Sequence, residues 1–371
     1  MNKKFWAATF TLTGTIIGAG ILGLPYVFAK SGLLIGIFWL ITIGTLMTFA
    51  NLALGEVTLR TKGKHQLSGY AKKYLGKWGE RVMFFSVIFG VYSALIAYLI
   101  GEGESLSKIL PGNISPIILG ITFWLIMTLM LREGLRGLKK IETWGVIVII
   151  LIIVGMFIRF APTINPQNLT TINPQNFVIP IGVVMFALLG FTSIPELRKE
   201  IRGKEKLLKK AIILGSAIPI ILYILFSTIF IGVLGANISE VATLSFGPLI
   251  TLLGIFTMLT SYFVLSFSLN ETFKYDFKTK KTTSILLTSV APLIIYILST
   301  YFNFIGFVLI LGIGGVISGG LTGILILLMA KKAKEHTKNE NNPEFQVPIN
   351  WPIIIILSIV FIAGIITQII Q

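Results

Sequence analysis

The chain has 371 residues, of which 54% are hydrophobic and 12% are charged, and its mean hydropathy is +0.89. This composition is too apolar for a soluble globular protein of this size and too regular for a disordered one. The net charge of +16 does not indicate nucleic-acid binding, because the basic residues fall in alternate loops, apart from Lys30, Lys108 and Arg159. Cysteine is absent, which excludes a disulfide framework and a thiolate metal site.

Apolar runs of about twenty residues recur along the whole chain, and such runs can cross a bilayer as helices. We predict an all-α polytopic membrane protein with eleven transmembrane helices. They cover residues 5–29, 33–59, 82–109, 116–131, 144–160, 178–197, 207–234, 246–273, 283–300, 305–329 and 351–370. The first is expected to be a retained helix, since no small-residue cleavage site follows a charged leader. The alternation of basic loops places the N-terminus in the cytoplasm and the C-terminus outside, and we expect the plasma (inner) membrane.

The first span contains four glycines and a proline within residues 14–25. Both residue types are unfavourable inside a helix. Backbone groups freed within a membrane are tolerated only where they face protein, water or a ligand. A Gly-X-X-X-Gly pair alone often serves only helix packing, and that alternative stays open for Gly14 and Gly18.

A helix that breaks and restarts here presents free amides and the positive end of its dipole. We therefore expect the amides of Ala19 and Gly20 to bind a carboxylate, with Thr15, Ile16 and Gly18 as further substrate-binding candidates. Bulk at Gly18 or Gly20 should then abolish substrate binding and leave the fold intact.

The sixth span is interrupted in the same way, at Gly190 and Pro195. Carbonyls freed before Gly190 would accept hydrogen bonds from an ammonium group. Amides on one side and carbonyls on the other would recognise the zwitterionic head group that all α-amino acids share. The phenylalanine rings could cover an apolar substrate side chain, although most of the 27 phenylalanines must face lipid or core. The substrate-binding candidates here are Met185, Phe186, Leu188 and Phe191, joined by Tyr98 of the third span.

Hydroxyl groups in the eighth span suggest a cation site. Thr257, Thr260 and Ser261 share one helix face. Such hydroxyls usually bond to their own helix or to a neighbour. The alternative is that they face carbonyls of the first break, because hard monovalent cations prefer a cage of oxygen atoms.

Four acidic residues lie near the ends of apolar spans. Glu102 and Glu104, at the external end of the third span, are expected to be solvated, because embedded charge is costly. Glu56 and Glu196 lie near the inner ends of the second and sixth spans. Each is either a structural partner of basic residues or part of a gate.

The span order predicts a five-plus-five inverted repeat with broken helices 1 and 6. Residues 1–160 hold the first five spans and residues 177–330 the next five, and each block opens with an interrupted helix. Because five is odd, the second block enters the membrane from the opposite side. An external linker at 161–176, a mobile cytoplasmic loop at 331–350 and one extra helix at 351–371 complete the chain. Interrupted helices in corresponding positions predict a substrate site at the midplane of a secondary transporter.

The chain lacks the sequence motifs of ATP-driven pumps and of hydrolytic enzymes. It has no nucleotide-binding Gly-rich Lys-Ser/Thr loop, and so no ATPase site. Paired acids or a histidine cluster that would indicate hydrolysis or a transition metal are also missing. We therefore expect a protein that is not an enzyme. Its expected partners are a small amino acid and the lipid bilayer, without nucleic acid, and its oligomeric state is not predicted.

Residues 14–25, residues 54–56 with 69–76, and residues 190–196 resemble the amino acid–polyamine–organocation superfamily. The resemblance is greatest to its amino acid/auxin and hydroxy/aromatic amino acid permease branches. It implies the leucine-transporter fold, alternating access, and an amino acid bound between helices 1 and 6.

The resemblance also implies a cation site between helices 1 and 8. Its ligands are the carbonyls of Gly14, Ile17 and Thr257 and the hydroxyls of Thr260 and Ser261. The fifth span has no lysine in the place where proton-coupled relatives often carry one, which favours sodium. Ile21 replaces the asparagine of symporters that hold a second sodium ion.

Together these patterns predict a symporter of a neutral, apolar or aromatic amino acid, driven by one sodium ion. One alternative is a proton-coupled permease of the same fold that uses Glu56 or Glu196. A metal-ion carrier of this fold is disfavoured, because the first break has no acid. A non-transporting amino acid sensor is disfavoured by the short tails and the lack of a soluble domain.

Overall fold

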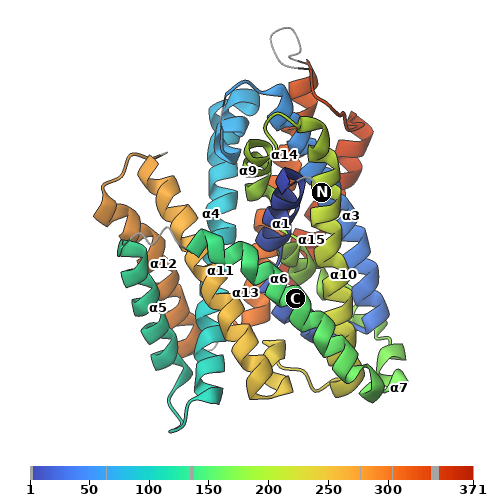
Figure 1. Cartoon of the computed structure of the whole chain (residues 1–371), viewed down its shortest axis with the longest axis vertical. Helices are drawn as coiled ribbons and strands as arrows, with labels where there is room; N and C mark the ends of the chain where they lie inside the picture. The colour runs from blue at the N-terminus through green and yellow to red at the C-terminus, as the bar shows by residue number, and fades with distance from the viewer. Residues whose placement is uncertain are drawn as a thin grey trace.

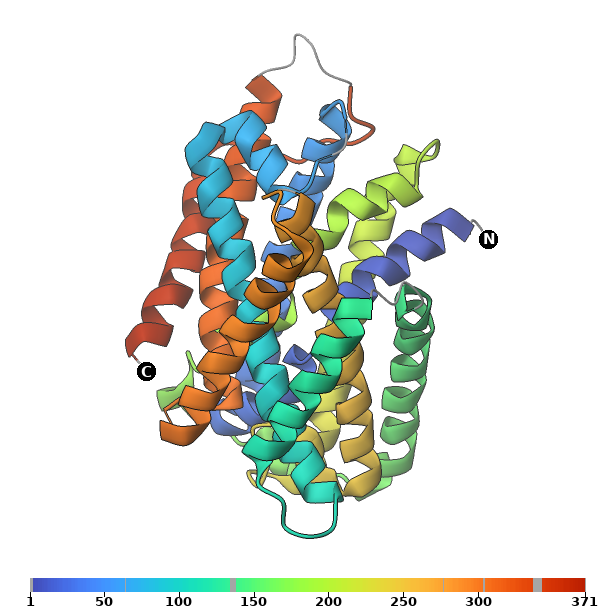
Figure 2. The same cartoon turned by 90° about the vertical axis from the view of Figure 1, so that its left-hand side faces the viewer.

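Helices make up 84% of the computed structural model, which describes residues 3–63, 65–133, 138–275, 277–302, 304–335 and 342–370 and has no strand among them. The longer helices are α1 (Lys3–Ile16), α2 (Gly20–Ser31), α3 (Leu33–Arg60), α4 (Leu67–Ile109), α5 (Pro116–Glu133), α6 (Leu138–Phe160), α7 (Pro166–Thr170), α8 (Pro180–Ala187), α9 (Ile194–Glu200), α10 (Leu208–Leu234), α11 (Pro248–Tyr275), α12 (Lys281–Phe302), α13 (Phe307–Gly314), α14 (Gly320–Glu335) and α15 (Trp351–Ile370). Short 3-10 turns are η1 (Ala161–Thr163), η2 (Pro174–Asn176), η3 (Phe191–Ser193), η4 (Glu205–Leu207) and η5 (Ala242–Phe246), and η6 (Gly315–Gly319) is a π-helical segment. Figures 1 and 2 show their arrangement as one elongated bundle.

Most of these helices are suited to a membrane. Eight are long and apolar enough to cross it, or nine if a bent pair forms one span, and two shorter apolar helices cover Pro116–Arg132 and Trp351–Gly364, all within the residues described. Each of the eleven predicted spans coincides with helix in the structure. The protein is therefore a multi-pass helical membrane protein. The count of eleven crossings and the inverted repeat remain predictions.

The first and sixth spans are both interrupted where glycine and proline gather. Helices α1 and α2 meet at an angle of 55° across the non-helical residues 17–19. Helix α8 ends at Ala187, and after non-helical residues 188–190 the chain continues as η3 and α9. We call these segments the first break and the second break.

Helix α4 begins earlier than predicted and contains a third interruption. It starts at Leu67, but Gly76 has φ 74° and ψ −166°, which is not helical. Positive φ is costly for residues with a Cβ atom, so glycine permits the turn. The segment before Gly76 lies outside the predicted third span, and the helix that follows spans the bundle.

Helices α4, α8 and α10 form the centre of the packing. Helix α10 packs on α1, α2, α3 and α6, while α8 packs on α2, α3, α13 and η6. Helix α4 packs on α5 and on all of α11 to α14. The two breaks therefore lie inside the bundle, where every neighbour is another helix.

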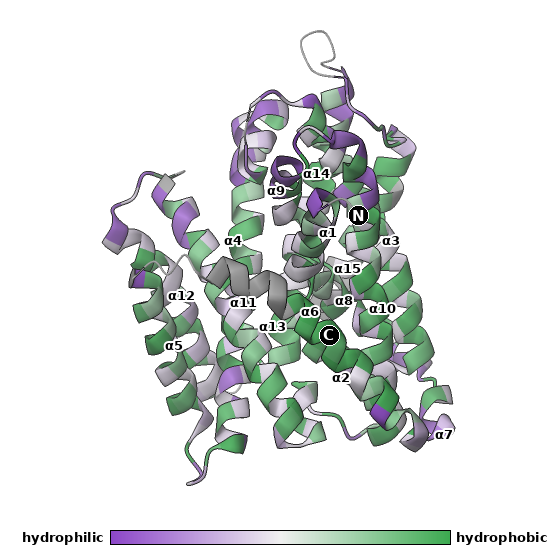
Figure 3. Cartoon of the chain, viewed as in Figure 1, coloured by the Kyte–Doolittle hydropathy of each residue, from purple (hydrophilic) through white to green (hydrophobic). Residues whose placement is uncertain are grey.

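Hydrophilic residues gather at one end of the bundle, around α9 and the connection between α3 and α4 (Figure 3). We call this the basic end, since residues 61–63, 65–66 and 201–207 carry Lys, Arg and His there. The opposite end carries α7 and η5 (Figure 1). The basic end is the one that the sequence predicts to be cytoplasmic.

The segment predicted to be a mobile loop, 331–350, includes helix and buried side chains in its described parts. Helix α14 continues to Glu335, and residues 336–341 lie outside the described residues. In residues 342–350, which we call the strap, Phe345, Val347 and Ile349 are only 9%, 5% and 9% exposed. These alternating apolar side chains pack into the main core, because burying them removes apolar surface from water.

Candidate functional site

Backbone groups are left unpaired at the first break. The amide of Ile17 still bonds to the Thr13 carbonyl at 2.9 Å, but the helical pattern then stops. The Ala19 amide donates to the hydroxyl of Tyr98 at 3.3 Å. The amides of Gly18 and Gly20 have no hydrogen-bond partner in the described part of the chain. Donors thus remain available at the start of α2, where the helix dipole is positive.

The second break leaves acceptors unpaired. The amides of Leu188 and Leu189 bond to the carbonyls of Val184 and Phe186 at 3.2 and 3.1 Å. The carbonyls of Met185 and Leu188 receive no hydrogen bond from any described residue. The Phe186 carbonyl, by contrast, already accepts a hydrogen bond.

Tyr223 of α10 joins the two breaks, and it is not among the residues predicted for the site. Its hydroxyl lies 2.8 Å from the carbonyl oxygen of Ile16 and 2.9 Å from that of Ala187, the last residues of α1 and α8. The side chain is fully buried. A buried tyrosine hydroxyl usually requires a partner, and a tyrosine inside an apolar span is a signal that could have drawn attention to it.

The glycines of the first break differ in what they face. A methyl group added to Gly18 would lie 2.9 Å from the Tyr98 hydroxyl, the end of a side chain. A methyl group on Gly20 would overlap the backbone of Ala187. The expectation that bulk at Gly20 leaves the fold intact is therefore wrong, because Gly20 is a packing contact between α2 and α8.

The predicted side chains of the second break point in different directions. Phe186 packs beneath Gly314 and Gly315, and Met185 lies near Gly319 and Gly364, so both turn towards the last helices of the chain. Leu188 and Phe191 are buried, with exposed fractions of 2% and 3%.

On the other side of the site, the Thr15 hydroxyl donates to the carbonyl of Thr11 in its own helix. The ring of Tyr98 lies 6.4 Å from that of Tyr262 in an edge-to-face arrangement. Tyr98 is thus the predicted side chain that directly contacts the first break.

The three hydroxyl groups predicted to bind a cation have hydrogen-bond partners within the bundle. The hydroxyl of Thr257 donates to Leu253 at 2.8 Å, and that of Thr260 donates to the Thr257 carbonyl at 3.0 Å. The Ser261 hydroxyl is within reach of Tyr98. Helix α1, which carries Gly14, packs mainly on α10, α9 and α6, while α11 packs mainly on α4 and α12. The two helices share no extensive packing in this conformation.

The acidic residues behave differently from one another. Glu102 is fully buried and both of its carboxylate oxygens lack a partner among the described residues, so the expectation that it is solvated is wrong. Glu56 is 1% exposed and bonded to Arg60 at 2.8 Å, which favours the structural alternative. Glu196 is half-buried in α9.

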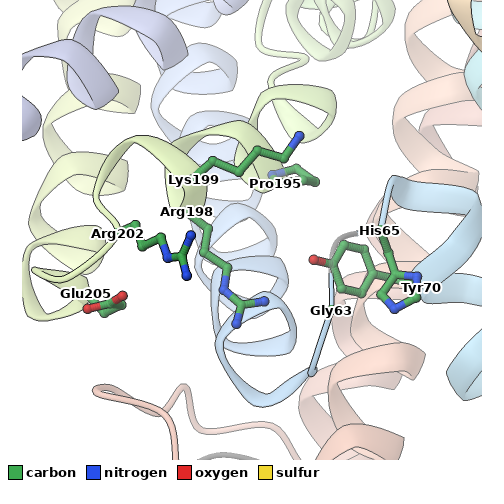
Figure 4. Close-up of a pocket in the computed structure, with 8 residues that line it drawn as sticks. All are labelled: Gly63, His65, Tyr70, Pro195, Arg198, Lys199, Arg202 and Glu205. Atoms are coloured by element: carbon green, nitrogen blue, oxygen red, sulfur yellow. The ribbon is translucent and has the colours of Figure 1, made fainter.

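A cavity of about 380 Å³ opens at the basic end, between α9 and the connection from α3 to α4. Figure 4 shows Tyr70 pointing across it towards Arg198. The Arg198 guanidinium donates to the carbonyl of Thr61 at 2.9 Å. A neighbouring cavity of about 580 Å³ shares His65 and Lys199 with the first. Both cavities lie at the basic end, and neither is lined by a residue of the first break (17–19) or the second break (188–190).

Comparison with known proteins places these features in a family. The model of the tryptophan/tyrosine permease family matches residues 1–264, which run from α1 into α11. The chain is 29% identical to tyrosine-specific transport system 1 of Haemophilus influenzae over 239 residues, 64% of this chain and 60% of that protein. It is 26% identical to glutamine transporter 2 of Aliivibrio fischeri, over 64% of this chain and 63% of that one.

A serine/threonine exchanger of Bacillus subtilis is 27% identical over 65% of this chain and 57% of its own length. The chain thus spans about three fifths of the length of the curated relatives it matches. The family match covers both breaks, Tyr98 and Tyr223. The chain belongs to the tryptophan/tyrosine permease family.

Proposed function

We propose that the protein is a secondary active transporter that carries a neutral amino acid by alternating access, and that it is a permease rather than an enzyme. The observation that carries this proposal is the pair of breaks with unpaired backbone groups of opposite kind. The amides of Gly18 and Gly20 suit a carboxylate, and the carbonyls of Met185 and Leu188 suit an ammonium group. The relatives are named for tyrosine, glutamine, and serine or threonine, which share this zwitterionic head group.

The side chains near the breaks support a neutral, apolar or aromatic substrate. Ile16, Leu188 and Phe191 are apolar and buried, and the Tyr98 ring adds an aromatic surface. Such a lining favours an apolar side chain, because a charged one would lose its hydration without gaining a counter-charge.

The location and the coupling ion belong to the same proposal. We place the protein in the plasma membrane, with the basic end in the cytoplasm. One sodium ion is the first candidate for coupling, held by the carbonyls of Gly14, Ile17 and Thr257 and the hydroxyls of Thr260 and Ser261. A hydroxyl that donates to its own helix, as Thr260 does, keeps its lone pairs available to a cation. Sodium would then bind in a conformation in which α1 packs against α11.

Exchange in proteoliposomes tests the transport function and the site together. Each of the twenty amino acids is assayed by counterflow, in which labelled external substrate exchanges with unlabelled substrate inside. In Gly18→Ala the added methyl group meets the Tyr98 hydroxyl at the proposed head-group site, and we expect the half-saturation concentration to rise at least about tenfold, or about 1.4 kcal/mol.

The matched control is Gly155→Ala, since a methyl group at Gly155 in α6 meets no atom within 4 Å. It should exchange like the wild type. If Gly18→Ala and Gly155→Ala behave alike, the substrate site lies elsewhere. A wild-type protein that binds amino acids without exchanging any would be a sensor and not a transporter.

The coupling ion is tested by imposing one gradient at a time. Uptake is measured with an inward sodium gradient at equal pH, and then with an inward proton gradient without sodium. Uptake that needs the sodium gradient supports the oxygen site between α1 and α11. Uptake that occurs only with the proton gradient would show that the coupling ion is a proton and not sodium.

A further inference from the structure

Glu102 is a buried acid that no structural contact explains. Its side chain is 0% exposed, and neither carboxylate oxygen has a hydrogen-bond partner among the described residues. An isolated carboxylate is very costly to hold away from water, while an uncharged carboxylic acid is much less so. Acids within membrane spans mark functional sites by default. Glu56 shows the contrast, because its buried carboxylate is paired with Arg60.

The two glycines that flank Glu102 are in close contact with neighbouring helices. A methyl group on Gly101 would lie 2.6 Å from the sulfur of Met258, and one on Gly103 would lie 2.5 Å from the carbonyl oxygen of Pro116. Helices α11 and α5 therefore press directly on the backbone at this level of α4. The two glycines permit this close approach, which leaves Glu102 without contact with water in this conformation.

The helical register places Glu102 on the face of α4 that meets the first break. Tyr98 lies one turn before it, about 6 Å along the axis, and Ser105 lies one turn after it. The Tyr98 hydroxyl accepts the amide of Ala19. The Ser105 hydroxyl is buried and, like Glu102, has no described partner. The acid is thus one turn from a side chain that touches the proposed substrate site.

The other titratable groups at this level have their own partners. On the packed helices, the Tyr296 hydroxyl of α12 donates to Pro116 at 3.1 Å, and Tyr262 of α11 packs its ring on Tyr98. Lys108 of α4 donates to the carbonyl of Leu244, and Glu240 accepts the amide of Val308 at 3.0 Å.

Tyr301, at the far end of α12, is exposed. The remaining titratable residues of α5, α11, α12 and α14 near this face lie towards the basic end, and α13 contains none. Glu104, two residues along α4, is only partly buried. No cation among the described residues therefore balances Glu102.

We propose that Glu102 binds a coupling proton during transport, an inference that rests on the proposed transport function. When the opposite end opens, the carboxylate takes a proton from hydronium, an O–H bond forms and water is left. The neutral acid can then be sealed as it is here. When the cycle exposes Glu102 to water from the basic end, the O–H bond breaks and water accepts the proton. Glu102 is not one of the oxygen ligands proposed for sodium, so this proton would be carried in addition to the sodium ion.

The test compares Glu102→Gln with Glu104→Gln in proteoliposomes. The probe is the amino acid that gives the largest counterflow in the wild type. Counterflow without gradients measures binding and exchange, accumulation under an inward proton gradient measures coupling, and an entrapped pH dye reports proton entry. Glu102→Gln should keep counterflow within about twofold and lose accumulation and substrate-dependent proton entry at least about tenfold.

Three comparisons decide the outcome. Glu104→Gln should behave like the wild type, and Glu102→Asp, which retains a carboxyl group, should restore proton-driven accumulation. Wild-type accumulation by Glu102→Gln would overturn the inference. Loss of counterflow in a Glu102→Gln protein that remains monodisperse would mean that the carboxylate binds the substrate ammonium group, which also overturns it.

Two wild-type results would overturn the inference as well. Accumulation that depends on sodium and brings no proton inside would leave Glu102 without a coupling role while the transport function stands. Absence of exchange with all twenty amino acids would instead remove the proposed transport function, and the inference with it.

Discussion

Tyr223 shows how one hydroxyl group can tie two broken helices together. The carbonyls of Ile16 and Ala187 would otherwise end α1 and α8 without a donor, in the interior of a membrane protein. Unpaired carbonyls in such surroundings destabilise a fold by an amount similar to a lost hydrogen bond. Because both carbonyls share one donor, a movement that separates the end of α1 from the end of α8 would stretch or break one of the two bonds.

Tyr223→Phe should therefore affect both stability and transport. We expect the free energy of unfolding to fall by about 1–3 kcal/mol, since two buried carbonyls lose their donor. The counterflow rate should fall at least about tenfold, because the two breaks are no longer held together. Thermal unfolding in detergent and counterflow in proteoliposomes measure the two effects.

Tyr92→Phe is the control for that prediction, since the Tyr92 hydroxyl donates to the Leu287 carbonyl at 2.6 Å in an exposed contact and bonds to neither break. It should lose some stability and keep the wild-type counterflow rate. Equal counterflow rates in the two variants would show that Tyr223 has no role at the breaks.

At the residue scale, the sequence predicts backbone chemistry better than side-chain surroundings. The sequence predicts that the amides of Ala19 and Gly20 bind a carboxylate. In the structure the Gly20 amide has no hydrogen-bond partner among the described residues, whereas the Ala19 amide donates to the Tyr98 hydroxyl. The burial of Glu102 could not be predicted in the same way. It depends on how closely Met258 and Pro116 approach Gly101 and Gly103, which is a property of the packed bundle and not of the local pattern.

At the scale of elements, the position of the strap depends on one buried carboxylate, that of Glu56. One oxygen of Glu56 in α3 lies 2.8 Å from Arg60, and the other accepts the amide of Val347 at 2.7 Å. Lys334 of α14 lies 3.6 Å from the same carboxylate and also donates to the Val347 carbonyl. The ion pairs therefore connect α3, α14 and the strap at the basic end.

Glu56→Ala should destabilise the protein and loosen the strap. It leaves Arg60, which is 4% exposed, as an unpaired buried cation, so we expect a loss of about 3–5 kcal/mol in the free energy of unfolding. The thermal unfolding midpoint and the rate of proteolytic cleavage within residues 342–350 check this.

The matched control is Glu80→Ala, which removes an exposed ion pair with Lys72 at 3.0 Å. Exposed pairs contribute less than about 1 kcal/mol, so this variant should unfold nearly like the wild type. A Glu56→Ala protein with wild-type stability and protease resistance would contradict the structural role of Glu56.

The elements themselves could be predicted where composition changes sharply. Clusters of glycine and proline predict the positions of both breaks, and runs of apolar residues predict the positions of the helices. The strap lies in a segment predicted to be a mobile loop, because its apolar residues alternate with polar ones over a stretch too short for a span. Only the surrounding helices show that Phe345, Val347 and Ile349 have a core to enter.

On the scale of the whole molecule, the inverted repeat depends on parity, because five crossings carry the chain from one side of the membrane to the other. The structure groups residues 61–63 and 65–66 with 201–207 at the basic end and places α7 at the opposite end (Figures 1 and 3). Which end faces the cytoplasm is set by the basic loops and not by the arrangement of the helices.

Cysteine labelling decides this orientation, because the native chain has no cysteine to remove. Asn165 and Asn237 lie at the end that carries α7 and η5, Lys204 lies at the basic end, and all three are exposed. In intact cells, Asn165→Cys and Asn237→Cys should react with a membrane-impermeant maleimide, while Lys204→Cys should react only after permeabilisation. The reverse pattern would mean that the basic end lies outside the cell and that the predicted orientation is wrong. Labelling of Asn165→Cys and Lys204→Cys from the same side would mean that the sixth predicted span does not cross the membrane, which would remove the first helix of the second repeat.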